Sequence, residues 1–154
     1  MNAAELNVRV VRKQAEALDI CSFELVQEDG RPLPAFSAGS HIDVQLPGGL
    51  TRQYSLCGNP ASADRYEMAV LKEAAGRGGS QSMHEGVQAG DELSISAPRN
   101  QFSLAPGARR SLLLAGGIGI TPLLAMAEAL HARGAPFTLH HATRSAARTP
   151  FVER

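Results

Sequence analysis

Two patterns of apolar and polar residues divide the chain at about residue 106. Before this point, short segments alternate apolar with polar residues and are separated by turn residues, which predicts strands with one buried face. After it, residues 111–115 are apolar except for the first, and residues 123–133 place apolar side chains at helical spacing. The sequence therefore predicts an antiparallel β domain over 1–106 and α/β structure over 107–154.

The first part predicts an antiparallel barrel or sandwich, because its strands are separated by turns and long helices are lacking. Pro47-Gly48-Gly49 turns the chain back between two of these strands and predicts a hairpin. A short helical turn with Ser80 as its N-cap is expected over 80–85. The expected strands cover residues 7–14, 20–26, 41–46, 50–56, 65–73, 93–98 and 102–104.

The second part predicts one β-α-β unit over residues 111–142, with its second strand at 136–142. Its first strand is expected to be buried on both faces, as parallel strands usually are. A single crossover unit cannot bury a parallel sheet, which needs several strands and helices on both faces. Because only a dozen residues follow the second strand, we expect a truncated α/β domain. Thr149 and Pro150 are typical of a helix cap and first turn, so another helix is expected to begin there.

The strand expected over 50–56 contains the first candidate site. Arg52 and Tyr54 share one face of it, while Gln53 and Ser55 share the other. A guanidinium binds phosphate oxygens through two parallel hydrogen bonds, and a tyrosine ring offers an apolar plane with a polar tip. Phosphate and a flat heterocycle together describe a flavin nucleotide. The alternative is a cation–π pair on an exposed strand face.

Gly78-Gly79-Ser80, at the start of the expected helical turn, is the second candidate site. Bare glycine backbone and unpaired amides at a helix N-terminus accept an anion, and Arg77 adds positive charge. The alternative is a flexible turn. Because sequential antiparallel strands are usually neighbours, this turn and Arg52 could bind one phosphate.

Gly116-Gly117-Ile118-Gly119 is the third candidate site. It departs from the G-x-G-x-x-G fingerprint, and no lysine follows it as in a Walker P-loop. It does lie between a strand and a helix, where backbone amides and the helix dipole can meet a pyrophosphate. Thr121 adds a hydroxyl, and Pro122 suits the first helical turn. The context favours nucleotide binding.

Composition narrows the possible partners. The chain of 154 residues has 15 basic and 15 acidic side chains, so it has no electrostatic footprint for nucleic acid or an anionic membrane. It has no membrane-length apolar run and no signal peptide, which predicts a cytoplasmic protein. Cys21 and Cys57 are expected to be core thiols, and His140 and His141, adjacent on a strand, cannot chelate one metal together. No metal site is expected.

The three motifs, in this order and at these distances, resemble those of the reductase components of phthalate dioxygenase and vanillate O-demethylase, in the ferredoxin-reductase superfamily. They are Arg52-Gln53-Tyr54-Ser55-Leu56, Gly76-Arg77-Gly78-Gly79-Ser80 and Gly116-Gly117-Ile118-Gly119-Ile120-Thr121-Pro122. The resemblance covers nearly the whole chain. It implies a Greek-key β-barrel that binds FMN, followed by the start of an α/β domain that binds a nicotinamide nucleotide.

The resemblance also implies roles for individual residues. Arg52 would hold the FMN phosphate, Tyr54 would pack on the isoalloxazine, and Ser55 would hydrogen-bond near its redox-active nitrogen. Ser55 and Thr121 are the expected catalytic positions. The remaining expected cofactor contacts are Gln53 beside Tyr54, Lys72 near the ring edge, Gly78, Gly79 and Ser80 on phosphate and ribityl, and Gly116, Gly117 and Gly119 with Thr121 on the nicotinamide nucleotide.

Proteins of this family add a C-terminal 2Fe-2S domain and pass electrons singly to a terminal oxygenase, which is the expected partner. This chain has no four-cysteine cluster, so the 2Fe-2S centre is expected outside it. The resemblance points to NADH, whereas Arg144 and Arg148 would suit the 2′-phosphate of NADPH. Three alternatives stay open: a FAD-dependent ferredoxin or flavodoxin reductase, a non-catalytic flavin- or nucleotide-binding module, and an interaction barrel without a ligand.

Overall fold

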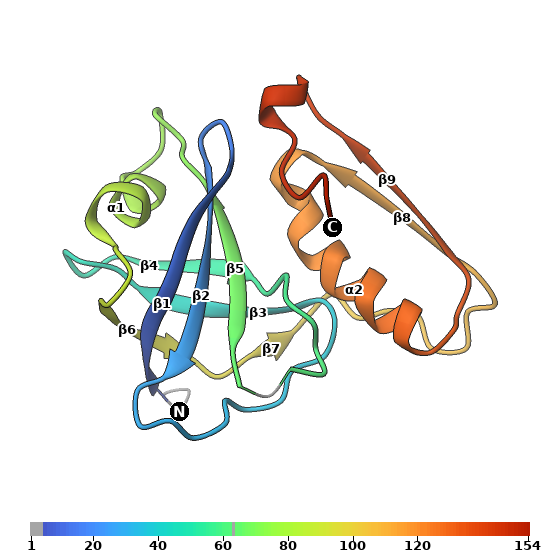
Figure 1. The fold of residues 1–154 in the computed structure, drawn as a ribbon, viewed down its shortest axis with the longest axis horizontal. Coiled ribbons are helices and arrows are strands. Elements are labelled where there is room, and N and C mark those ends of the chain that lie inside the picture. Colours follow the sequence, from blue (N-terminus) through green and yellow to red (C-terminus); the bar gives the residue numbers. More distant parts are fainter. Residues whose placement is uncertain (1–4, 63) are drawn as a thin grey trace.

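A computed structural model describes residues 5–62 and 64–154. The described residues up to 100 form a curled, half-open antiparallel barrel, seen at the left of Figure 1. Its strands lie in the order β4-β3-β6-β1-β2-β5, and β7 pairs with β3. The strands are β1 (Glu5–Ala17), β2 (Ile20–Gln27), β3 (Ser40–Gln45), β4 (Thr51–Ser55), β5 (Tyr66–Leu71), β6 (Glu92–Ser96) and β7 (Arg99–Asn100). The helix α1 (Gly79–Gly86) follows β5.

The interior of the barrel follows from the alternation in the sequence. On β3, Ile42 and Val44 are fully buried, while His41 and Asp43 face the other side of the sheet. β5 is buried on both faces along most of its length, as predicted. Tyr66 begins this strand, its hydroxyl donates to the carbonyl of Pro34, and burial raises its pKa to about 12.

β1 extends beyond both ends of the predicted strand. Its pairing with β2 shifts register between Val10 and Arg12 and again between Ala15 and Ala17. A bulge places an extra residue on one strand and reverses which side chains face the core beyond it. Val11 is this extra residue: it has no partner on β2, faces away from the buried side chain of Val10, and is 46% exposed.

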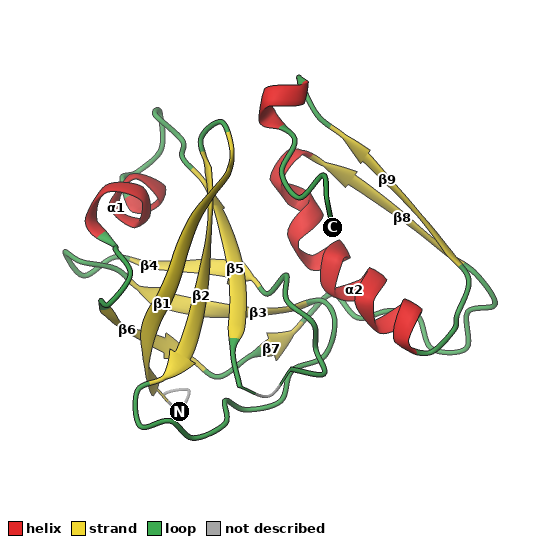
Figure 2. Cartoon of the chain, in the orientation of Figure 1, coloured by secondary structure: helices red, strands yellow, loops and turns green. Residues whose placement is uncertain are grey.

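The second part of the chain is the predicted β-α-β unit. Strands β8 (Ser111–Gly116) and β9 (Phe137–Ala142) pair in parallel, and α2 (Ile120–Ala132) connects them. Figure 2 shows α2 between the barrel and this two-stranded sheet. Two 3-10 turns, η1 (Gly117–Gly119) and η2 (Ala146–Arg148), complete it. One continuous apolar cluster includes side chains from both parts, so the division at residue 106 stays a prediction.

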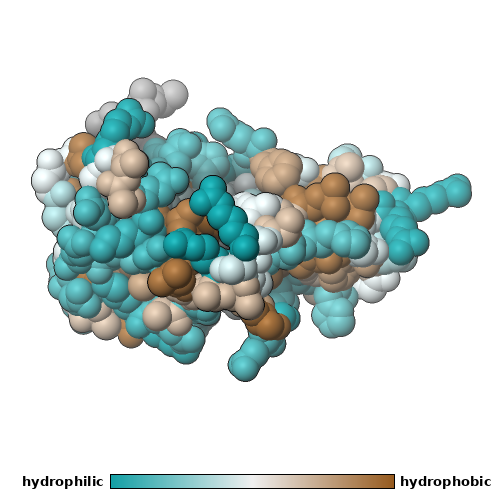
Figure 3. Space-filling model, turned by 90° about the horizontal axis from the view of Figure 1, so that it is seen from above, coloured by the Kyte–Doolittle hydropathy of each residue, from teal (hydrophilic) through white to brown (hydrophobic). Residues whose placement is uncertain are grey.

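β8 is not buried on both faces, so that prediction is wrong for the described chain. Leu113 and Ala115 are buried, whereas Leu112 and Leu114 are 62% and 67% exposed. Figure 3 shows hydrophobic side chains on the surface of the right-hand part of the molecule, where β8, β9 and α2 lie. A continuous apolar run is typical of a strand that is buried on both faces. The described residues cover only the face of β8 that carries Leu113 and Ala115.

Two further elements differ from the prediction. Residues 102–104 form no strand; β7 ends at Asn100, whose side chain accepts from the amide of Phe102 at 2.9 Å and so turns the chain. The predicted helix at 149–154 is absent, since Thr149 closes η2 and donates its hydroxyl to the carbonyl of Ser145 at 2.9 Å.

The N-cap prediction for Ser80 is also wrong. The N-cap of α1 is Gly78, in the left-handed conformation with φ 83°, and Ser80 lies inside the first turn. Its hydroxyl accepts from the backbone amide of Glu73 at 3.0 Å. The side chain therefore fixes the preceding loop, and the amides at the start of α1 stay available.

Candidate functional site

The three motifs meet in one cleft between the barrel and the β-α-β unit. This cleft, here called the first cleft, has a volume of about 720 Å³. Its walls come from β4, the end of β5, the loop that leads into α1, and the turn into α2. The predicted site residues that line it are Arg52, Gln53, Tyr54, Ser55, Gly79, Ser80, Gly119 and Thr121.

Arg52 and Gly79 are in direct contact. A Cβ atom added at Gly79 would lie 2.6 Å from Nε and 2.8 Å from Cγ of Arg52, so only glycine fits against this side chain. Arg52 also donates to the carbonyl of Thr51 at 2.8 Å, which orients the guanidinium. The start of α1, with its free amides and positive dipole end, thus lies beside a fixed cation. This arrangement can bind a phosphate.

Tyr54 lies two residues along β4 from Arg52 and is half-buried against the apolar core. Burial raises the pKa of its hydroxyl, and the charge of Arg52 only partly opposes this. The side chain therefore stays a neutral phenol at neutral pH. Its ring offers a fixed apolar surface beside the phosphate-binding groups, as a flat heterocycle requires.

The glycine-rich turn forms the opposite wall. Gly117 has a positive φ of 51°, and its carbonyl is 2.8 Å from Nε2 of His141 on β9. Thr121 is buried, and its hydroxyl donates to the carbonyl of Ile118 at 3.1 Å. That hydroxyl therefore shapes the turn, and Gly119 brings bare backbone to the cleft.

A second cleft of about 860 Å³ adjoins the first and shares Leu71, Glu73, Ala75, Gly76 and Ile118 with it. Gly116 and Gly117 line this second cleft, together with the cationic side chains Lys72, Arg144 and Arg148. Lys72 pairs with Glu85 at 2.7 Å, and Arg148 pairs with Asp19 at 3.2 Å. The structure thus separates Lys72, Gly116 and Gly117 from the residues around Arg52.

Gly78 lines neither cleft, and its role is to begin α1. Glu73, Ala75 and Pro122 line the first cleft, although no sequence motif singled them out as ligand contacts. Glu73 and Ala75 belong to the loop between β5 and α1, which has no periodic pattern, whereas Pro122 lies in the first turn of α2. His84 is structural: its Nε2 contacts the carbonyl of Val70 at 2.7 Å.

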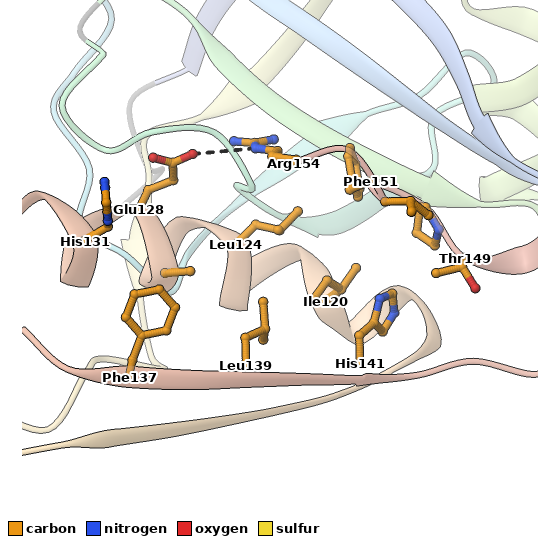
Figure 4. A pocket seen from close by; sticks show the side chains of 13 residues that line it. Ile120, Leu124, Glu128, His131, Phe137, Leu139, His141, Thr149, Phe151 and Arg154 are labelled. Carbon is orange, nitrogen blue, oxygen red and sulfur yellow. Dashed lines mark ion pairs between the residues drawn. The ribbon is translucent and has the colours of Figure 1, made fainter. Parts of the chain in front are cut away.

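A third cavity, of about 520 Å³, lies between α2, β9 and the C-terminal residues. Figure 4 shows Leu124 and Ile120 of α2 and Leu139 of β9 pointing into it. It is largely apolar and contains none of the three motifs except Ile120. In the described part of the chain, no helix combines the length and apolar content needed to cross a membrane.

Known proteins share both this sequence and this fold. The chain is 60% identical over 145 residues to vanillate O-demethylase oxidoreductase from Pseudomonas putida, covering 94% of this chain and 45% of that protein. It is 43% identical over 149 residues to phthalate dioxygenase reductase from Burkholderia cepacia, covering 96% of this chain and 46% of that protein. This chain belongs to the phthalate dioxygenase reductase and vanillate O-demethylase reductase family. No protein-family model matches it.

The solved structure of phthalate dioxygenase reductase has the same fold. It superposes with a TM-score of 0.95 at 42% identity, covering 97% of this chain and 47% of that one. That protein is described as a modular structure for electron transfer from pyridine nucleotides to [2Fe-2S]. The chain thus spans less than half the length of these relatives, and it has the ferredoxin-reductase fold.

Proposed function

We propose that this chain is the flavin-binding part, and the beginning of the nucleotide-binding part, of a reductase for an oxygenase or demethylase system. In this proposal electrons pass from NADH through FMN to a 2Fe-2S centre outside the chain, and then to a terminal oxygenase. The observation that carries the proposal is the convergence of Arg52, Gly79 and Gly119 on one cleft. The relatives, which are reductases by name, support the same reaction class.

The residues present fit an FMN phosphate. The side chain of Arg52 fills the space that a Cβ at Gly79 would take, so a cation lies directly against the start of α1. The helix has no acidic residue in its first turn to compete for the guanidinium. An anion of phosphate size can therefore accept from both the guanidinium and the backbone amides.

When bound, FMN would supply the redox chemistry, since it accepts two electrons as a hydride and releases them one at a time. The protein would hold and orient the ring. Tyr54 would pack on it, and Ser55 would hydrogen-bond to it, with Gln53 beside them on β4. The opposite wall, with Gly119, would admit the nicotinamide and hold it within reach while excluding water. The hydroxyl of Thr121 donates to the backbone carbonyl of Ile118 and would keep this wall in shape.

We infer that the second cleft takes the phosphates of the nicotinamide nucleotide, where Gly116 and Gly117 leave the backbone accessible. NADH is the preferred donor, because Arg148 is already paired with Asp19 and is not free to bind a 2′-phosphate. Arg144 lines the same cleft and is the cation that would favour NADPH. The predicted position of Lys72 at the flavin ring edge is not part of the proposal, since Lys72 lies in the second cleft.

A titration of the chain with FMN and with FAD, followed by flavin fluorescence quenching, tests the proposal. We expect FMN to bind more tightly than FAD. We also expect Arg52→Ala to weaken FMN binding by roughly 1.5–3 kcal/mol, the usual scale of a charge-assisted hydrogen bond. Arg9→Ala is the matched control, because Arg9 is an exposed barrel arginine that pairs with Glu92.

The outcomes of these experiments distinguish the proposed function from its alternatives. Equal FMN affinity in the Arg52→Ala variant and the native chain would overturn the phosphate assignment. Tighter binding of FAD would favour a FAD-dependent ferredoxin or flavodoxin reductase. Flavin binding without bleaching by NADH in the longer natural protein would favour a non-catalytic binding module, and no flavin binding at all would favour an interaction barrel.

A further inference from the structure

The polar links between the two parts of the molecule come from one short segment, residues 147–154, here called the strap. Within the described residues, every hydrogen bond or ion pair that joins 5–106 to 107–154 uses an atom of the strap. α2 and β8 contribute apolar contacts to the shared core and no such polar link. In Figure 1 the strap runs down from the 3-10 turn that follows β9, and the C-terminus lies close to α2.

The first anchor of the strap is the turn between β1 and β2. The carbonyl of Ala147 accepts from the amide of Leu18 at 2.8 Å, and Arg148 Nη1 lies 3.2 Å from Oδ2 of Asp19. The carbonyl of Asp19 in turn accepts from the amide of Lys72 at 2.7 Å. The strap is thereby tied to the end of β5, which forms one wall of both clefts.

The second anchor is the guanidinium of Arg154. Nη1 lies 3.0 Å from Oε2 of Glu67 on β5, and Nη2 donates to the carbonyl of Cys57 at 2.9 Å. Nε is 3.7 Å from Oε1 of Glu128 on α2, the pair marked in Figure 4. One planar fork therefore joins the barrel to the helix that follows the glycine-rich turn. The side chains of Arg154 and Glu67 are 25% and 23% exposed, so water screens this pair only in part.

Both clefts have one wall from each part of the molecule, so their width depends on how the two parts are held together. We propose that Arg148 and Arg154 are positioning residues, which hold the glycine-rich turn at a fixed separation from Arg52 and Tyr54. Neither residue lines the first cleft, and they act on it through the placement of the two parts. The consequence for hydride transfer rests on the function proposed above, whereas the consequence for domain placement does not.

Residual dipolar couplings of backbone amides test the placement directly. In the native chain, couplings from both parts fit a single alignment tensor. In the Arg148→Gln, Arg154→Gln double variant, each part fits well alone but the two tensors differ. Arg110→Gln is the control, because Arg110 donates to Thr138 within the second part, and it keeps the single tensor. A single tensor in the double variant would overturn the proposal.

If the double variant does not fold, the single variant Arg154→Gln tests the placement instead. Two different alignment tensors would support the proposal, and a single tensor would overturn it. For function, we expect FMN affinity within about twofold of the native value and flavin reduction by NADH slower by about tenfold or more, because misplacement of reacting groups is costly. Arg154→Lys, which keeps the charge facing Glu67 but loses the planar fork, restores only part of the rate. Should the native chain bind no flavin, the proposed function fails, while the couplings still decide the role of the strap.

Discussion

At the scale of single residues, the site depends on glycine at position 79, because this residue has no side chain. Arg52 occupies the space beside it, at distances that no Cβ would tolerate. The sequence indicated that Arg52 and the Gly78-Gly79 pair could share one phosphate. It could not show that the glycine is needed for the arginine itself, because that contact joins residues 27 positions apart, from Arg52 to Gly79.

We predict that Gly79→Ala weakens FMN binding by about 1–3 kcal/mol, the usual cost of forcing a group into filled space. The methyl group would displace the flexible side chain of Arg52, so the fold itself should survive. Gly86→Ala, at the other end of α1, is the matched control, since its added Cβ would meet nothing closer than 3.8 Å. Isothermal titration of both variants with FMN measures the difference, and equal affinities would contradict the packing argument.

Asp43 gives a second prediction at this scale. Burial is the largest influence and would raise its pKa, but the hydrogen bonds from Arg99, at 2.7 Å, and from Gln53, together with the charge of Arg99, outweigh it, so the pKa lies below its ordinary value of 3.8. The ionised carboxylate of Asp43 therefore stabilises the fold fully when the pH is above its ordinary pKa. This stabilisation is lost as the pH falls through the lowered pKa of the folded state. Because the Arg99 side chain is 36% exposed, screening limits the gain. We expect Asp43→Asn to cost about 1 kcal/mol at neutral pH.

Urea unfolding of the native chain and Asp43→Asn at pH 7 and at about pH 3 measures this contribution. The difference in unfolding free energy should shrink at the lower pH. A difference that stays constant between the two pH values would show that the charge of Asp43 contributes nothing.

At the scale of elements, periodicity located most strands and the type of the last helix. β3, β4, β8, α2 and β9 lie within a few residues of their predicted positions, because alternation and helical spacing follow directly from burial. The boundaries that were missed each depend on one residue: a hydrogen bond to the side chain of Asn100, and the left-handed backbone of Gly78. Asn100 ends β7 and Gly78 begins α1, and neither event changes the apolar pattern.

β8 supplies the prediction at this scale. We expect Leu113→Ala to lower the unfolding free energy by roughly 2–5 kcal/mol, as for other buried leucines. Leu112→Thr should change it by less than about 0.5 kcal/mol, because Leu112 is 62% exposed and threonine suits a strand. Chemical denaturation of the two variants is the measurement. A large loss for Leu112→Thr would mean that the outer face of β8 is covered in solution.

At the scale of the whole molecule, charge balance determines how the protein behaves in solution. With 15 basic and 15 acidic residues the net charge at pH 7 is zero, and Leu112 and Leu114 add exposed apolar area. We predict that solubility in polyethylene glycol is lowest near pH 7 and rises on either side, because net charge opposes association. A flat profile would show that apolar contacts, and not charge, limit solubility.

The sequence by itself determined most of the strands, the β-α-β unit and the chemical character of the three motifs, because each depends on residue type and short-range spacing. Only the tertiary structure decided which motif residues share a cleft. Arg52, Gly79 and Gly119 line the first cleft, whereas Lys72, Gly116 and Gly117 line the second. The tertiary structure also joined the two parts through Arg148 and Arg154. These contacts link residues far apart in the chain, and no local pattern encodes the distance between them.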